Sequence, residues 1–274
     1  MTPKTGKWSD LTRRVASALV LIAIGAALAL SQGVVLWLGV SVFMAITFWE
    51  LARLTGWRGH VDQTGTGTGG WRPVLLAATA GLSLFAALGM PGWALPILMI
   101  PVVAGLPGAV PRDRVTYGLF GMAIMAVGFE LVHLRQAYGL PFILWLMGVV
   151  IISDVAGYFA GRIIGGPKFW PRLSPKKTWS GTVAGWIGAA LLGAFLWSRG
   201  QADAAAIWLS VLVALAGQLG DIAESWLKRR AGVKDSSNLI PGHGGFMDRF
   251  DAVSGAVLAV MVLSWIMGLP RVGL

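Results

Sequence analysis

The chain contains no cysteine among its 274 residues. This absence excludes disulfide bonds, catalysis by a thiol and zinc sites with cysteine ligands, and it leaves the redox compartment undetermined. Charged residues are also scarce, at 12% of the chain, whereas apolar residues make up 56%. Soluble globular domains carry about 25% charged residues. The composition therefore excludes a soluble protein and predicts an all-α, polytopic integral membrane protein.

Apolar runs long enough to cross a bilayer recur along the whole chain. Allowing about twenty apolar residues for each span gives about nine candidate transmembrane helices. They lie near residues 13–31, 34–54, 73–90, 92–107, 115–133, 141–161, 181–199, 204–226 and 250–269. Prolines bound the third and fourth, so a re-entrant pair is an alternative to two full spans. We expect one membrane-embedded domain over 1–274, with an N-terminal helical half (1–133) and a C-terminal half (134–274) that carries the functional site.

Basic residues are in excess, and the formal net charge is +10. They are spread over short loops between apolar runs, which favours anionic lipid headgroups and small anions, and not nucleic acid, as partners. With a cytoplasmic N-terminus, the alternating loops place all of the 22 Lys and Arg residues on the cytoplasmic side except Arg135, Arg199 and Arg271. This asymmetry predicts an odd number of spans. We expect a bacterial-type inner (cytoplasmic) membrane protein whose site faces the cytoplasm.

The stretch 220–251 concentrates acidic residues between two apolar runs. Its acids are Asp221, Glu224, Asp235, Asp248 and Asp251. Asp221 and Glu224 share one helix face with Ser225, and the two last acids have the same spacing where the next helix begins. Two helix ends would present facing oxygen ligands, which suits Mg²⁺. The alternatives are an ordinary helical pair of Glu224 with Lys228 and simple helix capping by the last two acids.

The same stretch resembles the C-terminal signature of the phosphatidate cytidylyltransferases, also called CDP-diacylglycerol synthases. Its fixed positions are filled by Ser225, Lys228-Arg229, Lys234-Asp235, His243-Gly244-Gly245 and Asp248-Arg249-Phe250-Asp251. An upstream segment resembles a second conserved region of that family, through Asp154, Tyr158, Gly161-Arg162 and Ser174 to Gly181. Two departures occur. Val155-Ala156-Gly157 replaces the usual Thr-Gly-Ala, and Ser180 stands where many members carry Glu.

The resemblance implies a Mg²⁺-dependent nucleotidyltransferase that joins CTP and the membrane lipid phosphatidate into CDP-diacylglycerol and pyrophosphate, for phospholipid biosynthesis. We expect one or two cations on Asp221, Asp248 and Asp251. The residues expected to contact phosphates are Lys228, Arg229, Lys234 and Arg249, with Ser225 and His243 as hydrogen-bonding groups and Gly244 and Gly245 beside them. Asp235 either orients Lys234 or approaches the metal. The sequence leaves the oligomeric state open, including a homodimer.

A second basic element, Lys176-Lys177-Thr178, precedes an expected helix that opens with Gly181. Backbone N–H groups at a helix start, with adjacent lysines, can bind a phosphate. The alternative is a positive-inside anchor, which needs only the charges. Because Thr178 and Gly181 add nothing to an anchor, we favour binding of the triphosphate or of the lipid headgroup.

Three other features have less specific interpretations. Glu50 and Glu130 lie late in apolar runs, where a capped or paired structural carboxylate is favoured over a catalytic one. The glycines of 65–70 formally fit a dinucleotide-binding fingerprint, but without a βαβ context they indicate a flexible linker. The competing function is a membrane transporter for an anionic phosphorylated substrate. It would need coupling residues along several spans and often an internal repeat, which the sequence lacks.

Overall fold

The structure is a computed structural model that describes residues 7–56 and 70–273, with side chains from residue 15 onward. The predicted linker at Gly65 and Gly67 lies outside the described residues, as do Lys4, Arg58 and His60.

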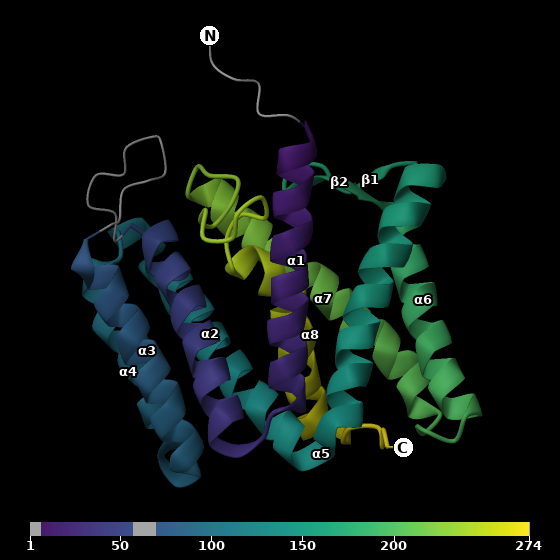
Figure 1. The fold of residues 1–274 in the computed structure, drawn as a ribbon, viewed down its shortest axis with the longest axis horizontal. Coiled ribbons are helices and arrows are strands. Elements are labelled where there is room, and N and C mark those ends of the chain that lie inside the picture. The colour runs from purple at the N-terminus through teal and green to yellow at the C-terminus, as the bar shows by residue number, and fades with distance from the viewer. Residues whose placement is uncertain (1–6, 57–69, 274) are drawn as a thin grey trace. The chain divides into compact units, whose positions relative to one another are not determined.

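Helices make up most of the described chain (Figure 1). The α-helices are α1 (Lys7–Leu30), α2 (Gly33–Leu54), α3 (Trp71–Gly89), α4 (Ala94–Gly105), α5 (Arg114–Ile163), α6 (Trp179–Ser198), α7 (Ala205–Arg230) and α8 (Met247–Met267). Among the described residues, 7 helical segments are long and apolar enough to cross a membrane. This confirms the predicted all-α, polytopic membrane fold.

Helix α5 covers two of the predicted spans, 115–133 and 141–161. Its backbone leaves the helical region at Gly139, where φ is 79° and ψ is −174°. Glycine adopts a positive φ without steric cost, and Pro141 just beyond it cannot donate a backbone hydrogen bond to the preceding turn. The break therefore falls between the two predicted spans. The total number of membrane crossings stays a prediction.

Proline-containing 3₁₀ turns surround α4. They are η1 (Pro91–Trp93), η2 (Leu106–Gly108) and η3 (Pro111–Asp113). The Tyr117 hydroxyl donates a hydrogen bond of 2.8 Å to the carbonyl of Pro101 inside α4, which ties that helix to the start of α5. The third and fourth predicted spans are thus separate helices, and whether each crosses the bilayer fully stays a prediction.

The chain forms two compact units. The first consists of Met1–Gly128 and Val233–Arg249, and the second of Phe129–Gly232 and Phe250–Leu274. In the first unit, α2 packs along α3, and the buried rings of Phe48 and Tyr117 meet edge to face with centroids 5.9 Å apart. Segment 233–249 belongs to this unit although it lies late in the chain.

Small residues bring the helices of the second unit close together. A Cβ added at Gly181 of α6 would overlap the carbonyl of Gly157 in α5, and one added at Gly193 would overlap Ala206 of α7. Such close backbone approach through small residues is typical of membrane helices.

A two-stranded antiparallel hairpin precedes α6, formed by β1 (Lys168–Trp170) and β2 (Ser174–Thr178). The sequence does not predict this hairpin, because strands this short carry no useful alternation of polar and apolar residues.

Candidate active site

Helices α7 and α8 approach each other closely where their acidic residues lie. A Cβ added at Gly220 would overlap the carbonyl of Asp251, and one added at Gly255 would overlap the carbonyl of Ala216. The two backbones can therefore come together only because glycine occupies both positions. Asp221, the residue after Gly220, is held beside Asp251 by this contact.

Three carboxylates gather at this crossing. Ligand oxygens of Asp221, Glu224 and Asp251 all lie within 4.8 Å of one another. Glu224 is buried and pairs with Lys228 at 2.5 Å, so the i,i+4 helical pair that the sequence offers as an alternative does form. Like charges this close repel one another unless cations compensate them. Carboxylate oxygens are the ligands that Mg²⁺ prefers, so the chemistry of these residues fits a divalent cation.

The cluster has a second basic partner that the sequence did not indicate. The Lys177 ammonium of β2 forms an ion pair with Asp221, although the two residues lie on different elements. Both side chains are only partly buried, with 24% and 31% of their surface exposed. Ser225 donates a long hydrogen bond of 3.4 Å to Asp221 Oδ1. Asp221 therefore has partners on its own helix and on the hairpin.

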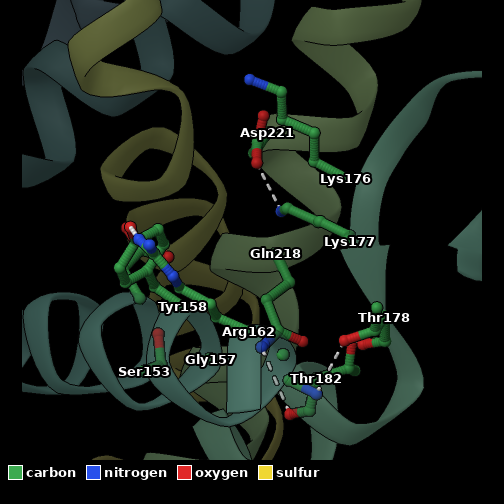
Figure 2. Close-up of a pocket in the computed structure, with 13 residues that line it drawn as sticks. Ser153, Gly157, Tyr158, Arg162, Lys176, Lys177, Thr178, Thr182, Gln218 and Asp221 are labelled. Carbon is green, nitrogen blue, oxygen red and sulfur yellow. Dashed lines mark hydrogen bonds and ion pairs between the residues drawn. The ribbon is translucent and has the colours of Figure 1, made fainter. Parts of the chain in front are cut away.

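A cavity of about 530 Å³ lies beside Asp221 within the second unit (Figure 2). Figure 2 shows Lys177 directed at the Asp221 carboxylate, and the Gln218 side-chain amide donating a hydrogen bond to the Thr182 carbonyl. The polar side chains around the cavity come from α5, the hairpin, α6 and α7. They are Ser153, Asp154, Tyr158, Arg162, Lys176, Lys177, Thr178, Thr182, Gln218 and Asp221. All three members of the Lys176-Lys177-Thr178 element thus line one cavity.

Thr178 has a structural role as well. Helix α6 begins at Trp179, earlier than expected, and the Thr178 hydroxyl caps it by accepting a 3.2 Å hydrogen bond from the Gly181 amide. Gly181 is needed for the close approach to Gly157. Helix capping explains Thr178 and helix packing explains Gly181 without a ligand. Within this element, only the two lysines beside the cavity indicate phosphate binding.

The departure at Ser180 also has a local explanation. Its hydroxyl donates a 2.5 Å hydrogen bond to the carbonyl of Gly165, and its oxygen lies 3.0 Å from the Thr178 hydroxyl. Ser180 thereby joins the loop before the hairpin to the first turn of α6.

Segment 233–249 of the first unit surrounds another cavity, of about 410 Å³. Five predicted substrate-binding residues line it together, namely Lys234, Asp235, His243, Gly244 and Arg249. The Arg249 guanidinium donates to the His243 carbonyl at 2.7 Å, and the His243 ring nitrogen Nδ1 lies 2.7 Å from the Ser17 hydroxyl of α1. The segment therefore gathers cationic groups around a single cavity.

Asp248 organises this segment. Its Oδ2 atom accepts hydrogen bonds from the Ser236 amide at 2.9 Å, the Ser236 hydroxyl at 3.0 Å and the Gly245 amide at 2.7 Å. A Cβ added at Gly245 would overlap the Ser236 hydroxyl oxygen. Asp248 and Gly245 thus have defined structural partners, and their roles in metal and substrate binding stay predictions. Arg229 is exposed on the last turn of α7, apart from the described linings of both cavities.

Comparison with known proteins identifies the family of this chain. Residues 12–267 match the profile of the cytidylyltransferase family. The chain belongs to this family.

Curated relatives of this cytidylyltransferase family member include phosphatidate cytidylyltransferases from several bacteria. The protein of that name from Brucella suis is 40% identical over 159 residues, which cover 57% of this chain and 58% of the relative. The one from Helicobacter pylori is 38% identical over 138 residues, covering 49% and 51%. The one from Staphylococcus saprophyticus is 38% identical over 138 residues, covering 49% and 53%. The chain thus aligns with little more than half the length of these relatives.

Several site residues of this family member were not identified from its sequence. Glu224 shares the predicted ligand-bearing helix face with Asp221 but is not among the predicted metal ligands, yet its carboxylate belongs to the cluster. Gln218 precedes Asp221 by three residues, so its amide could have been placed on the same face of α7. The small-residue pattern Ala216-x-x-x-Gly220 was a further signal of a close helix crossing. Polar residues inside apolar helices therefore indicate a functional site as strongly as polar residues in loops do.

Proposed function

We propose that this protein transfers the cytidylyl group of CTP to phosphatidate, giving CDP-diacylglycerol and pyrophosphate. In this reaction a phosphate oxygen of phosphatidate forms a bond to the α-phosphorus of CTP. The bond from that phosphorus to the bridging oxygen breaks, and the electron pair leaves with pyrophosphate. Because phosphatidate supplies an ionised nucleophile, the protein need not provide one. The observation that carries the proposal is the carboxylate cluster of Asp221, Glu224 and Asp251 beside a cavity with basic side chains.

The cluster is suited to holding Mg²⁺. Asp221 and Asp251 would supply oxygen ligands, with Asp248 as a further predicted ligand on α8 and a second cation as part of the proposal. When bound, the cation would neutralise phosphate charge and stabilise the leaving pyrophosphate.

The chain's own basic residues would do the rest of the electrostatic work. Lys176, Lys177 and Arg162 line the cavity beside Asp221, where their three positive charges would attract a phosphorylated substrate. Lys177 also pairs with Asp221, so the same side chain can hold the carboxylate in place and attract an anion. Bringing two polyanionic substrates together requires such compensation, and it lowers the barrier most where negative charge develops. Lys228 would act indirectly, by neutralising Glu224.

The cavity of segment 233–249 is proposed as a second phosphate site. Lys234, His243 and Arg249 would contact phosphate oxygens, and Gly244, whose φ is 83°, lines the same cavity. Asp235 lies against Gly244 in the same lining and would orient the cations. The transporter alternative is not favoured, since the family and its named relatives are transferases.

The experiment uses purified protein in detergent with CTP, Mg²⁺ and phosphatidate. We expect release of pyrophosphate that depends on added phosphatidate, together with formation of CDP-diacylglycerol identified by mass spectrometry. Release of pyrophosphate without phosphatidate, or no nucleotide-linked lipid under any condition, would exclude the proposed reaction.

We also propose that the protein lies in the inner membrane with the hairpin on the cytoplasmic side. The absence of cysteine from the chain allows single introduced cysteines to be probed without background. A membrane-impermeant thiol reagent should label Ala204→Cys, in the loop before α7, in intact spheroplasts. It should label Arg172→Cys, in the hairpin, only after lysis, and the reverse pattern would invert the topology.

A further inference from the structure

Glu50 is a fully buried carboxylate in the apolar helix α2. A buried acid in a membrane helix is costly unless it has strong hydrogen-bond partners, and it commonly marks a functional element. The partners of Glu50 do not come from its own helix. They come from Ser237, Phe246 and Met247, all within segment 233–249.

Both carboxylate oxygens of Glu50 are engaged. Oε1 accepts hydrogen bonds from the Ser237 hydroxyl at 2.5 Å and from the Phe246 amide at 2.8 Å. Oε2 accepts one from the Met247 amide at 2.6 Å. A neutral amide side chain in place of the acid could accept at only one of its two terminal atoms.

These backbone amides lie at the start of α8, which begins at Met247. The first N–H groups of a helix have no partner within the helix, and a side-chain oxygen usually caps them from the preceding residue. Phe246 stands at that position and has no such oxygen. Glu50 of α2 instead accepts from the amides of Phe246 and of Met247, the first helical residue, and its carboxylate lies at the positive end of the helix dipole.

A second contact joins the same two parts of the first unit. The ring of Phe43, two turns before Glu50 on α2, meets the ring of Phe246 edge to face with centroids 4.7 Å apart. A Cβ added at Gly245 would lie too close to Glu50 Oε1 as well as to Ser236. Segment 233–249 is therefore fixed against α2 by an acid, an aromatic pair and a tight glycine contact.

We propose that Glu50 is a positioning residue that holds segment 233–249 in the conformation that binds a substrate phosphate group. The chemistry it serves is that of the cavity lined by Lys234, His243 and Arg249, where two cationic side chains and an imidazole suit a phosphate monoester or a triphosphate. Glu50 does not itself line that cavity in the described chain. The inference rests on the proposed function for its kinetic readout but not for its structural one.

The test compares wild-type protein with Glu50→Gln, Glu50→Asp and Ser237→Ala. Hydrogen exchange followed by mass spectrometry should show the amides of Phe246 and Met247 exchanging roughly tenfold faster in Glu50→Gln, because at least one acceptor is lost. Ser237→Ala removes one hydrogen-bond donor and leaves the hydrogen bonds from both backbone amides to Glu50, so it should speed amide exchange less. Glu50→Asp keeps the charge and both acceptors and should recover part of the protection.

Steady-state kinetics then identify the ligand. In Glu50→Gln, the KM for one phosphate substrate should rise by about fivefold or more while kcat falls less, as expected for a lost ground-state contact. A rise for CTP alone assigns the triphosphate to the cavity, and a rise for phosphatidate alone assigns the lipid headgroup. Glu130→Gln is the matched control, because Glu130 is another buried acid of an apolar helix, and it should leave both KM values unchanged.

Two results would overturn the inference. One is unchanged amide exchange at Phe246 and Met247 in Glu50→Gln. The other is wild-type KM values for both substrates with a loss of activity that merely follows the fraction of folded protein, measured by thermal unfolding. An inactive wild-type protein would instead contradict the proposed reaction and leave the exchange result to decide on the positioning role.

Discussion

Two regions of the molecule carry the signature residues, and each is stabilised internally by a different kind of contact. Segment 233–249 in the first unit is fixed by hydrogen bonds from its backbone amides and serines to Glu50 and Asp248. The cluster at the crossing of α7 and α8 in the second unit is held by glycine packing and by ion pairs to Lys177 and Lys228. Substitutions in the first region should therefore make the backbone of segment 233–249 more mobile. Substitutions in the second should change the balance of charge around the carboxylate cluster.

The largest effect is expected from Asp251→Asn in the carboxylate cluster. Removing a charged ligand where the cation is proposed to bind should lower kcat by roughly 100-fold or more. Amide exchange in segment 233–249 should stay unchanged, which separates the two regions. Asp203→Asn is the control, since Asp203 is exposed and accepts a hydrogen bond from the Arg271 amide. Activity of Asp251→Asn near that of this control would remove Asp251 from the site.

A smaller but still large effect is expected from Gly220→Ala. The added methyl group would overlap the carbonyl of Asp251, so α7 and α8 must separate and the carboxylates with them. We expect kcat to fall roughly tenfold, because small displacements of reacting groups are costly. Gly25→Ala in α1 is the control, since a Cβ there meets nothing within 4 Å. Equal activity of the two variants would show that close helix approach does not matter for the cluster.

Lys177→Met tests the charge balance at Asp221. We expect a loss of roughly tenfold in kcat/KM, because both an ion pair and a cationic group at the cavity disappear. Lys168→Met removes a charge from the exposed strand β1 of the same hairpin and should have little effect. If the two variants behave alike, the hairpin contributes general positive charge and not a specific contact.

The smallest effect is expected from Ser225→Ala. The hydrogen bond from Ser225 to Asp221 is long, at 3.4 Å, so its loss should change kcat by no more than about threefold. A loss comparable to that of Asp251→Asn would mean that the Ser225 hydroxyl contacts a substrate.

Much of the fold could be predicted from the sequence, because long apolar runs determine where membrane helices form. The predicted ranges fall on helices of the structure, with Gly139 and Pro141 marking the interruption of α5. The hairpin before α6 could not be predicted. Its short strands follow from local pairing and from the contact of Trp179 with Pro167, which no periodic pattern reveals.

The residue types of the site could be predicted better than the contacts that these residues make with one another. The local spacing of Asp221 with Glu224, and of Glu224 with Lys228, could be read from helical geometry. The pairing of Lys177 with Asp221 could not, since the two residues lie 44 positions apart and only the tertiary packing brings them together. The same holds for Glu50, whose partners lie nearly 200 residues further along the chain.

The central claim is that Asp221 and Asp251 hold a divalent cation, and Mn²⁺ binding to the purified protein tests it most directly. Electron paramagnetic resonance should detect Mn²⁺ bound to wild-type protein and to Glu50→Gln alike. The double variant Asp221→Asn with Asp251→Asn should bind it at least about tenfold more weakly, because both anionic ligands are lost. Equal Mn²⁺ affinity in the wild-type protein and in the folded double variant would contradict the claim.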